Sequence, residues 1–275
     1  MPTAFYPPAR PLGVGEVLDL AFRIFKATLV RGLPYGICAM IAGQLPNIYD
    51  LGSGAARQPF GGGRPAWVAL FLLGVLVTLI AWSALLLRQQ AIIEHRPTRS
   101  KSELAATLRR LPSFVATTLL VLLAVGAGFA VLLVVPRPYR GVAVGTLLAL
   151  SSYVGVLLSC AWPAVLFAGE GPAGALRHSV RLVWGNWWRV ASIYAVGAAV
   201  VLVIAILVAA LIPMVVPALL ADIPVMMAVL RVAVNALGAV AAPFFGALVL
   251  AAFGDLRVRR EGIDLQQRIA DLAVE

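Results

Sequence analysis

The residue types that most often bind metals or act as nucleophiles are scarce in this chain of 275 residues. There are two histidines, His95 and His178, and two cysteines, Cys38 and Cys160. A zinc site needs three or four protein ligands that converge on one point. Each histidine instead lies in an arginine-rich segment without acidic residues at ligand spacing, and both cysteines lie in apolar stretches. We interpret the histidines as solvated surface residues and the cysteines as packing residues.

Longer motifs for catalysis or cofactor binding are also missing from the sequence. It contains no GxSxG elbow, no P-loop, no HExxH and no paired-cysteine metal motif. Each of these motifs places specific groups at the spacing that its chemistry requires. We therefore predict no catalytic site, no metal and no cofactor, and we expect that the protein is not an enzyme.

Three amide side chains within apolar segments are the next candidates for a site. Along a helix with a rise of 1.5 Å per residue, Gln44 and Asn47 lie about 20 and 24 Å beyond Arg31, and Asn235 lies about 6 Å inward of Arg231, so the three fall at a similar depth in the outer part of the membrane. Polar groups in hydrocarbon need a partner or a cavity. The three amides could line a polar cavity, or they could form hydrogen bonds between helices, which is the commoner use and the one we favour.

The elements that carry these residues are apolar helices. The chain is 61% hydrophobic and 12% charged, with a mean hydropathy of +0.95, whereas about a quarter of a soluble domain is charged. A helix needs about 20 residues to cross about 30 Å of hydrocarbon. The sequence predicts an all-α polytopic membrane bundle, a single domain over 1–275, with six spans at about 32–50, 67–87, 111–135, 142–168, 190–216 and 232–253. The first span is the weakest, and a re-entrant segment there is the alternative.

Basic residues predict the orientation of these spans. Most of the 22 lysines and arginines lie before the first span, in the connections after the second and fourth, and after the sixth. Because basic loops stay on the cytoplasmic side, we expect both termini to be cytoplasmic. The first thirty residues show no cleavable signal sequence. The net charge of +10 does not indicate a nucleic-acid partner, since the basic residues lie between apolar blocks.

The basic segments also show helical periodicity. Polar and apolar residues alternate as on two faces of a helix over about 13–30, 100–110 and 172–185, which predicts three cytoplasmic amphipathic helices at the membrane surface. Each precedes a pair of spans, so the chain could be three copies of one helix-plus-hairpin unit. We expect contact with anionic lipid headgroups or with a protein partner at Glu16, Asp19, Arg23, Arg177, Arg181, Arg257, Arg259 and Arg260.

Three strings in these segments resemble a known family. They are RPLGVGEVLDLAFRIFK over Arg10–Lys26, ALRHSVRLVWGNWWRV over Ala175–Val190 and DLRVRREGIDLQ over Asp255–Gln266. Together they resemble the bacterial glycerophosphoryl diester phosphodiesterase membrane domain family, in which an aromatic residue commonly precedes the last string, where Gly254 stands here. The family takes its name from fusions to a catalytic domain, and most members that stand alone have no established activity. The resemblance therefore implies a helical fold in the bacterial cytoplasmic (inner) membrane rather than a reaction.

Three functions are compatible with this sequence. The leading hypothesis is a non-enzymatic scaffold or accessory subunit for a membrane or cytoplasmic partner, because the recognisable strings lie in cytoplasmic segments and catalytic groups are scarce. The alternative is a transporter or lipid-handling protein, which the amides and the prolines within spans favour. A third reading, implied by the resemblance, is a membrane domain associated with glycerophosphodiester metabolism.

Overall fold

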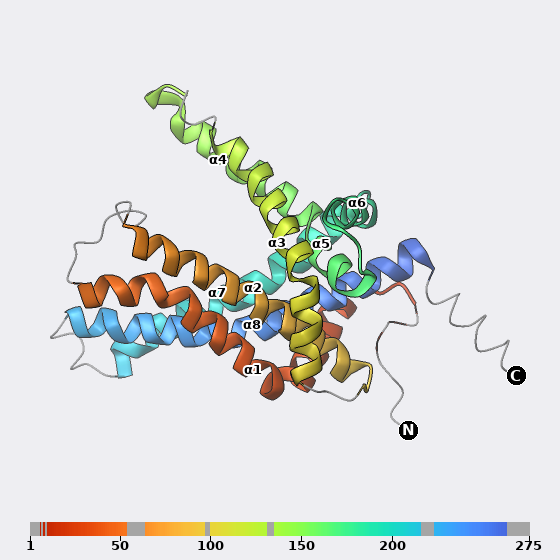
Figure 1. Ribbon diagram of the computed structural model, residues 1–275, viewed down its shortest axis with the longest axis horizontal. Helices are drawn as coiled ribbons and strands as arrows, with labels where there is room; N and C mark the ends of the chain where they lie inside the picture. Colours follow the sequence, from red (N-terminus) through yellow and green to blue (C-terminus); the bar gives the residue numbers. More distant parts are fainter. Residues whose placement is uncertain are drawn as a thin grey trace, which may run out of the picture. The chain divides into compact units, whose positions relative to one another are not determined.

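The computed structural model describes residues 6, 8, 10–53, 64–96, 100–130, 135–215 and 223–262, and these residues contain helices and no strand (Figure 1). The long helices are α1 (Val14–Ser53), α2 (Pro65–Ile93), α3 (Ser100–Ala130), α4 (Arg140–Leu157), α6 (Pro172–Val183), α7 (Trp187–Val215) and α8 (Ile223–Glu261). Three short turns of helix are η3 (Arg137–Tyr139), α5 (Ala161–Pro163) and η4 (Ala164–Ala168). The all-α class predicted from the sequence is confirmed.

Within the described residues, six stretches of helix are long and apolar enough to cross a membrane. They are Val14–Asp50, Pro65–Ile93, Glu103–Phe129, Arg137–Ala168, Trp187–Ile212 and Val229–Glu261. Each overlaps one predicted span. The third and fifth end earlier than predicted, at Phe129 and Ile212, and the predicted residues 131–134 and 216 lie outside the described residues. The protein is therefore a multi-pass membrane protein with helical spans.

Two of the three predicted surface helices are not separate elements. The segments 13–30 and 100–110 are the first turns of α1 and α3, which continue without a break. Pro34 and Pro112 lie inside these helices, where each leaves the carbonyl four residues earlier without its N–H donor. Along the start of α1, one face is exposed at Glu16, Asp19, Arg23 and Lys26 and the other is buried at Val17, Leu20, Ala21 and Ile24. Only α6 stands alone.

The predicted fourth span is not one continuous helix. Helix α4 ends at Leu157, and a turn leads to α5 and η4. Pro163 has no N–H to continue the ladder through this turn. The hydroxyl of Ser179 on α6 replaces part of that ladder, because it donates to the carbonyl of Leu157 (2.8 Å) and accepts from the N–H of Cys160 (3.1 Å). Helix α6 is thereby fixed to the break.

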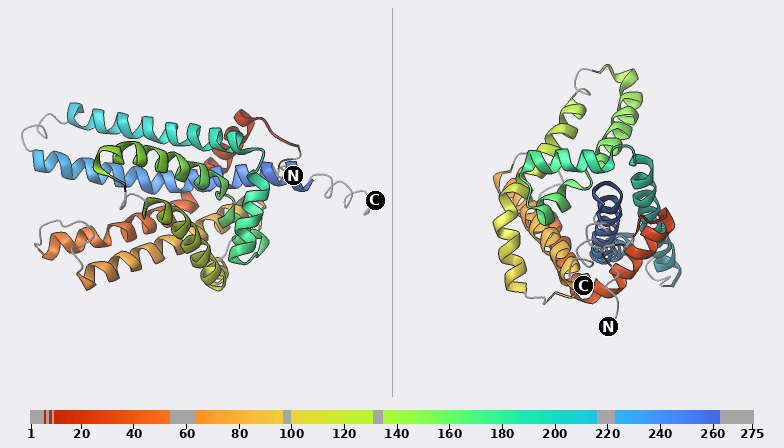
Figure 2. Two further views of the ribbon diagram at one scale, coloured as in Figure 1. Left: turned by 90° about the horizontal axis from the view of Figure 1, so that it is seen from above. Right: turned by 90° about the vertical axis from the view of Figure 1, so that its right-hand side faces the viewer.

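The chain forms two compact units that share helices α1, α3, α7 and α8. Unit 1 contains Met1–Val17, Ala105–Ile193 and Val249–Glu275, and unit 2 contains Leu18–Leu104 and Tyr194–Leu248. In unit 1, α3 and α4 lie side by side, and Trp162 donates to the hydroxyl of Thr118 (3.1 Å). In unit 2, α1 lies beside α2, and α7 beside α8 (Figure 2). The single domain over 1–275 stays a prediction.

Glycines allow the helices of unit 2 to approach closely. A Cβ atom built on Gly74 of α2 would lie 2.5 Å from the carbonyl oxygen of Ala42 on α1. One built on Gly36 of α1 would collide with the carbonyl oxygen of Ala239 on α8. Pro243, four residues after Ala239, has no N–H for that carbonyl. The freed oxygen therefore faces the α-carbon of Gly36, a close contact that is common between helices.

Gly36→Ala is expected to destabilise the protein, whereas Gly43→Ala, on the same helix, is not. Overpacking costs about 1–3 kcal/mol, while alanine in an open helical position gains up to about 1 kcal/mol of helix propensity. Nothing lies within 4 Å of a Cβ atom at Gly43. The denaturation midpoint of the purified protein measures both effects. Equal midpoints for the two variants would contradict the close approach of α1 and α8.

Candidate functional site

Two arginines of unit 1, Arg189 and Arg259, contact Asp255, near the C-terminal end of α8. Its side chain is 1% exposed. Oδ1 accepts the N–H of Leu12 at 2.8 Å, and Oδ2 accepts Nε and Nη2 of Arg189 at 3.2 and 3.0 Å. Arg259, one turn along α8, donates Nε to Oδ2 at 3.1 Å. A carboxylate with these donors is held by charge-assisted hydrogen bonds from both sides.

The same arginines fix the peptide of Leu12. Nη2 of Arg189 and Nη2 of Arg259 both donate to the carbonyl oxygen of Leu12, while its N–H is bound by Asp255. The segment before α1, the start of α7 and the end of α8 are therefore joined at one point, which we call the Asp255 junction. Each partner comes from a different string of the sequence resemblance: Leu12 from the first, Arg189 from the second, and Asp255 with Arg259 from the third.

A tyrosine explains the glycine that stands directly before the third string. The ring of Tyr6 covers Gly254, since a Cβ atom there would lie 2.7 Å from Cε2 of the tyrosine. The Tyr6 hydroxyl donates to the carbonyl of Leu250 at 3.4 Å, and the side chain is buried. A larger residue at 254 would occupy the same volume. The aromatic group at this place is thus supplied by the N-terminal segment.

His178 lies between two glutamates, so the interpretation of it as solvated is wrong. Its side chain is 9% exposed; Nδ1 is 2.5 Å from Oε1 of Glu170, and Nε2 is 3.1 Å from Oε1 of Glu261. The second contact has the distance of an ion pair but not the alignment of a hydrogen bond. The carboxylates approach opposite ring nitrogens and do not converge on one point as metal ligands do. Sequence reasoning missed them because Glu170 and Glu261 are far from each other in the chain.

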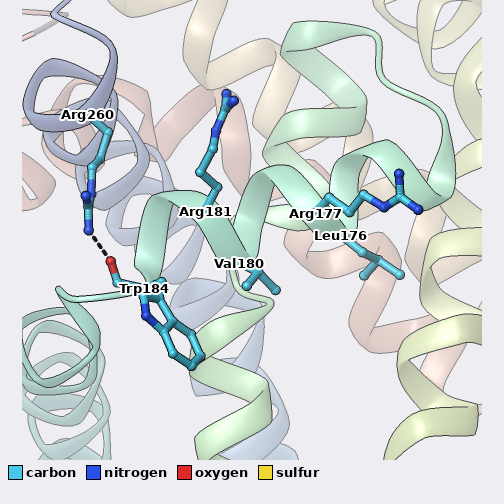
Figure 3. A pocket seen from close by; sticks show the side chains of 6 residues that line it. All are labelled: Leu176, Arg177, Val180, Arg181, Trp184 and Arg260. Carbon is cyan, nitrogen blue, oxygen red and sulfur yellow. Dashed lines mark hydrogen bonds between the residues drawn. The ribbon is translucent and has the colours of Figure 1, made fainter.

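An open groove runs along α6 (Figure 3). It encloses about 530 Å³ and is lined by Leu176, Arg177, Val180, Arg181, Trp184 and Arg260. Figure 3 shows Val180 and Trp184 projecting from one side of α6 and Arg181 from the other, while Arg177 extends beside Leu176. Arg260 reaches from α8 and donates to the carbonyl oxygen of Trp184. The groove therefore has an apolar side and a cationic rim.

The residues predicted to contact a partner or lipid divide into two sets. Four are used within the protein: Glu16 binds the N–H of Gly13 (2.6 Å) and pairs with Arg10, Arg257 pairs with Glu261 (2.8 Å), Arg259 binds Asp255, and Arg260 binds Trp184. The other four are exposed, namely Asp19 and Arg23 in unit 2 and Arg177 and Arg181 in unit 1. Asp19 and Arg23, although four residues apart, are not within ion-pair distance in the described structure.

The predicted amide level in unit 2 forms a hydrogen-bonded chain. Gln44 of α1 donates to Asn235 of α8 at 2.9 Å, and Asn47 donates to Gln44 at 2.8 Å. The structure thus brings all three amides together and gives them one another as partners. This is the arrangement expected of hydrogen bonding between helices.

Two buried polar groups of unit 2 were not anticipated. Arg88 pairs with Glu103 at 2.9 Å, and Glu103 also accepts from the hydroxyl of Tyr35 at 3.3 Å. Gln89, fully buried, donates to the hydroxyl of Thr28 (3.1 Å) and to a backbone carbonyl of α8 (2.8 Å). The only signal was a polar triplet, Arg88–Gln90, at the end of an apolar run. Its partners are distant in sequence, so the pattern alone could not identify them.

Asp255→Asn is expected to lower the free energy of unfolding by about 3 kcal/mol. This is the low end of the cost of breaking a buried ion pair, since both guanidinium groups keep some contact with water. Arg10→Gln, which breaks the exposed pair with Glu16 (side chains 65% and 44% exposed), should cause a much smaller shift. Chemical denaturation of the purified protein measures both. Similar shifts would mean that the Asp255 junction is not a stabilising contact.

Gln44→Leu and Asn235→Leu are expected to be coupled. The two single variants and the double variant form a thermodynamic cycle, and hydrogen bonds between membrane helices typically give about 0.6 kcal/mol of coupling. Unfolding midpoints of the four proteins supply the value. Additive effects would show that the two amides do not interact.

Comparison with known proteins does not place the chain in a family. None of the protein-family models, curated proteins or solved structures that were searched matches it.

Proposed function

We propose that this protein is a non-enzymatic integral membrane protein that acts as a scaffold or accessory subunit for a protein partner. The observation that carries the proposal is how the described carboxylates are used. Apart from Asp19, each described acidic residue lies within 4 Å of an arginine or histidine nitrogen. Glu103, Asp255 and Glu261 in this way join segments that are distant in the chain. We propose that these ion pairs stabilise the surface to which a protein partner binds.

The membrane and the orientation belong to the same proposal. The protein lies in the bacterial cytoplasmic membrane, as the resemblance implies, with both termini on the cytoplasmic side. The distribution of lysine and arginine along the sequence supports this orientation. The Asp255 junction and α6 then face the cytoplasm. A scaffold role agrees with the resemblance, whose family includes fusions of this membrane domain to a catalytic domain.

The start of α1 is the surface that we assign to the partner. Asp19 and Arg23 are exposed there, and Phe22 between them is 44% exposed. Their charges are not used within the described structure, in contrast to Glu16 one turn earlier. An exposed aromatic residue flanked by unpaired charges of both signs can provide an anchor and a charge pattern for docking.

The experiment is native mass spectrometry of the protein extracted together with its surrounding lipid. We expect a second protein at fixed stoichiometry, and we expect Asp19→Lys combined with Arg23→Glu to reduce its amount at least about ten-fold, because like charges placed opposite each other cost several kcal/mol. Arg109→Glu is the control, since Arg109 is an exposed arginine on α3.

Two results would contradict the scaffold role. One is wild-type protein that carries lipid or solute but no protein at fixed stoichiometry. The other is a bound protein whose amount falls equally in the control and in the charge-reversed variant, since this would indicate a nonspecific attraction.

A further inference from the structure

Helix α6 is held at the surface of the membrane by its connections. The span before it ends at Ala168, and the span after it begins at Trp187. Between them lie only 169–186, which include α6 itself, so α6 cannot move far from the ends of two spans. Trp184 and Trp188 are 62% and 79% exposed. Tryptophan is enriched at the level of the lipid headgroups, and these two residues place α6 at that level.

The α6 groove combines apolar and cationic surface at this depth. Leu176 and Val180 are one turn apart on α6, with Trp184 one turn further, and they form its apolar side. Arg177 and Arg181 follow the same spacing one residue later and form its rim. Successive residues on a helix differ in direction by about 100°, so the apolar row and the arginine row run next to each other.

The arginines of the rim keep most of their charge available. Arg177 is exposed and has no ion pair in the described structure. Arg181 is 75% exposed and lies 4.0 Å from Glu261, a carboxylate that also pairs with Arg257 at 2.8 Å. The third arginine, Arg260, donates to the carbonyl of Trp184 and keeps α6 against α8. The groove thus presents two guanidinium groups, one helical turn apart, and no carboxylate among its lining residues.

We propose that the α6 groove binds an anionic phospholipid. The phosphodiester accepts hydrogen bonds from Arg177 and Arg181, and an acyl chain lies along Leu176, Val180 and Trp184. Arginine suits this role because its planar fork matches the oxygens of a phosphate. An acidic peptide would satisfy the arginines but would leave the apolar row without a matching partner. This site goes beyond the proposed scaffold function, which uses a different surface.

The test uses purified full-length protein and two lipids. Native mass spectrometry measures the binding of added phosphatidylglycerol and of phosphatidylcholine with the same acyl chains. We expect wild-type protein to bind phosphatidylglycerol more tightly, and Arg177→Gln with Arg181→Gln to weaken that binding by about thirty-fold, which corresponds to two arginine contacts of ordinary strength at a membrane surface. Phosphatidylcholine binding should change less than about two-fold.

A matched control removes the same charge elsewhere. Arg23→Gln with Arg109→Gln replaces two exposed arginines outside the groove and should leave phosphatidylglycerol binding unchanged. Arg177→Lys with Arg181→Lys keeps the charge and should restore part of the affinity, since lysine binds phosphate as a point charge. Equal binding of the two lipids by wild-type protein would overturn the proposal without any variant. An equal loss of phosphatidylglycerol binding in the Arg23→Gln, Arg109→Gln control would also overturn it.

A separate arm distinguishes lipid from free phosphate. Inorganic phosphate and glycerol phosphate are added as competitors, and Leu176→Gln tests the apolar side. We expect neither competitor to displace phosphatidylglycerol at millimolar concentration, and we expect the Leu176 variant to weaken lipid binding. Displacement by free phosphate, with no effect of Leu176→Gln, would show a soluble anion site and overturn the lipid proposal. None of these outcomes depends on a protein partner, so the scaffold proposal stands or fails separately.

Discussion

A buried carboxylate is stable only when cations and N–H groups surround it, and this requirement at Asp255 organises unit 1. The charge is removed from water almost completely, which would be costly without partners. Two arginines and one backbone N–H meet the requirement. They come from parts of the chain that are far apart in sequence, so the end of α8 determines where the segment before α1 and the start of α7 lie. Tyr6 over Gly254 and Arg260 on the carbonyl of Trp184 extend the same attachment to the N-terminal segment and to α6.

The sequence predicted where the helices lie better than it predicted the contacts between them. An uncharged run of about 20 residues has the length of a helix that crosses the hydrocarbon of a membrane. The six spans could therefore be predicted from length and composition. Helix α6 was predicted from the polar and apolar periodicity over 172–185, and the structure places it at Pro172–Val183, with Gly185 at a φ of +84° just beyond its end. The amphipathic pattern over 13–30 was read as a separate helix, but periodicity reports which side of a helix is buried and not where the helix stops. The break after Leu157 depends on Ser179, a contact across 22 residues that no local pattern encodes.

In the candidate site, too, the sequence predicted the position of some residues but not their contacts. The amides at Gln44 and Asn235 could be matched by depth, because helix rise is constant, and their hydrogen bond agrees with the hypothesis that we favoured. The arginines could not be sorted into structural and exposed sets from sequence, since the carboxylates and carbonyls that bind some of them are distant in the chain, as Asp255 is from Arg189. The three-dimensional structure separates them. Arg189 and Arg259 bind Asp255, Arg257 pairs with Glu261 at 2.8 Å, and Arg260 binds a backbone carbonyl. Arg177 is exposed, and Arg181 is 75% exposed and only 4.0 Å from Glu261, so both keep charge at the surface. The proposed partner surface on α1 and the proposed lipid groove on α6 both rely on exposed charged side chains that are not held closely by other residues of the described structure, namely Asp19, Arg23, Arg177 and Arg181.

The central claim is that Asp255 joins the segment before α1 to α7 and α8. Hydrogen–deuterium exchange at the N–H of Leu12, in full-length protein within lipid nanodiscs, tests it most directly. The preceding residue, Pro11, has no N–H, so few amides contribute to a peptide of this segment. We expect slow exchange at Leu12 in the wild type and fast exchange in a variant whose residue 255 lacks a side-chain acceptor, Asp255→Ala. Fast exchange at Leu12 in the wild type would contradict the account.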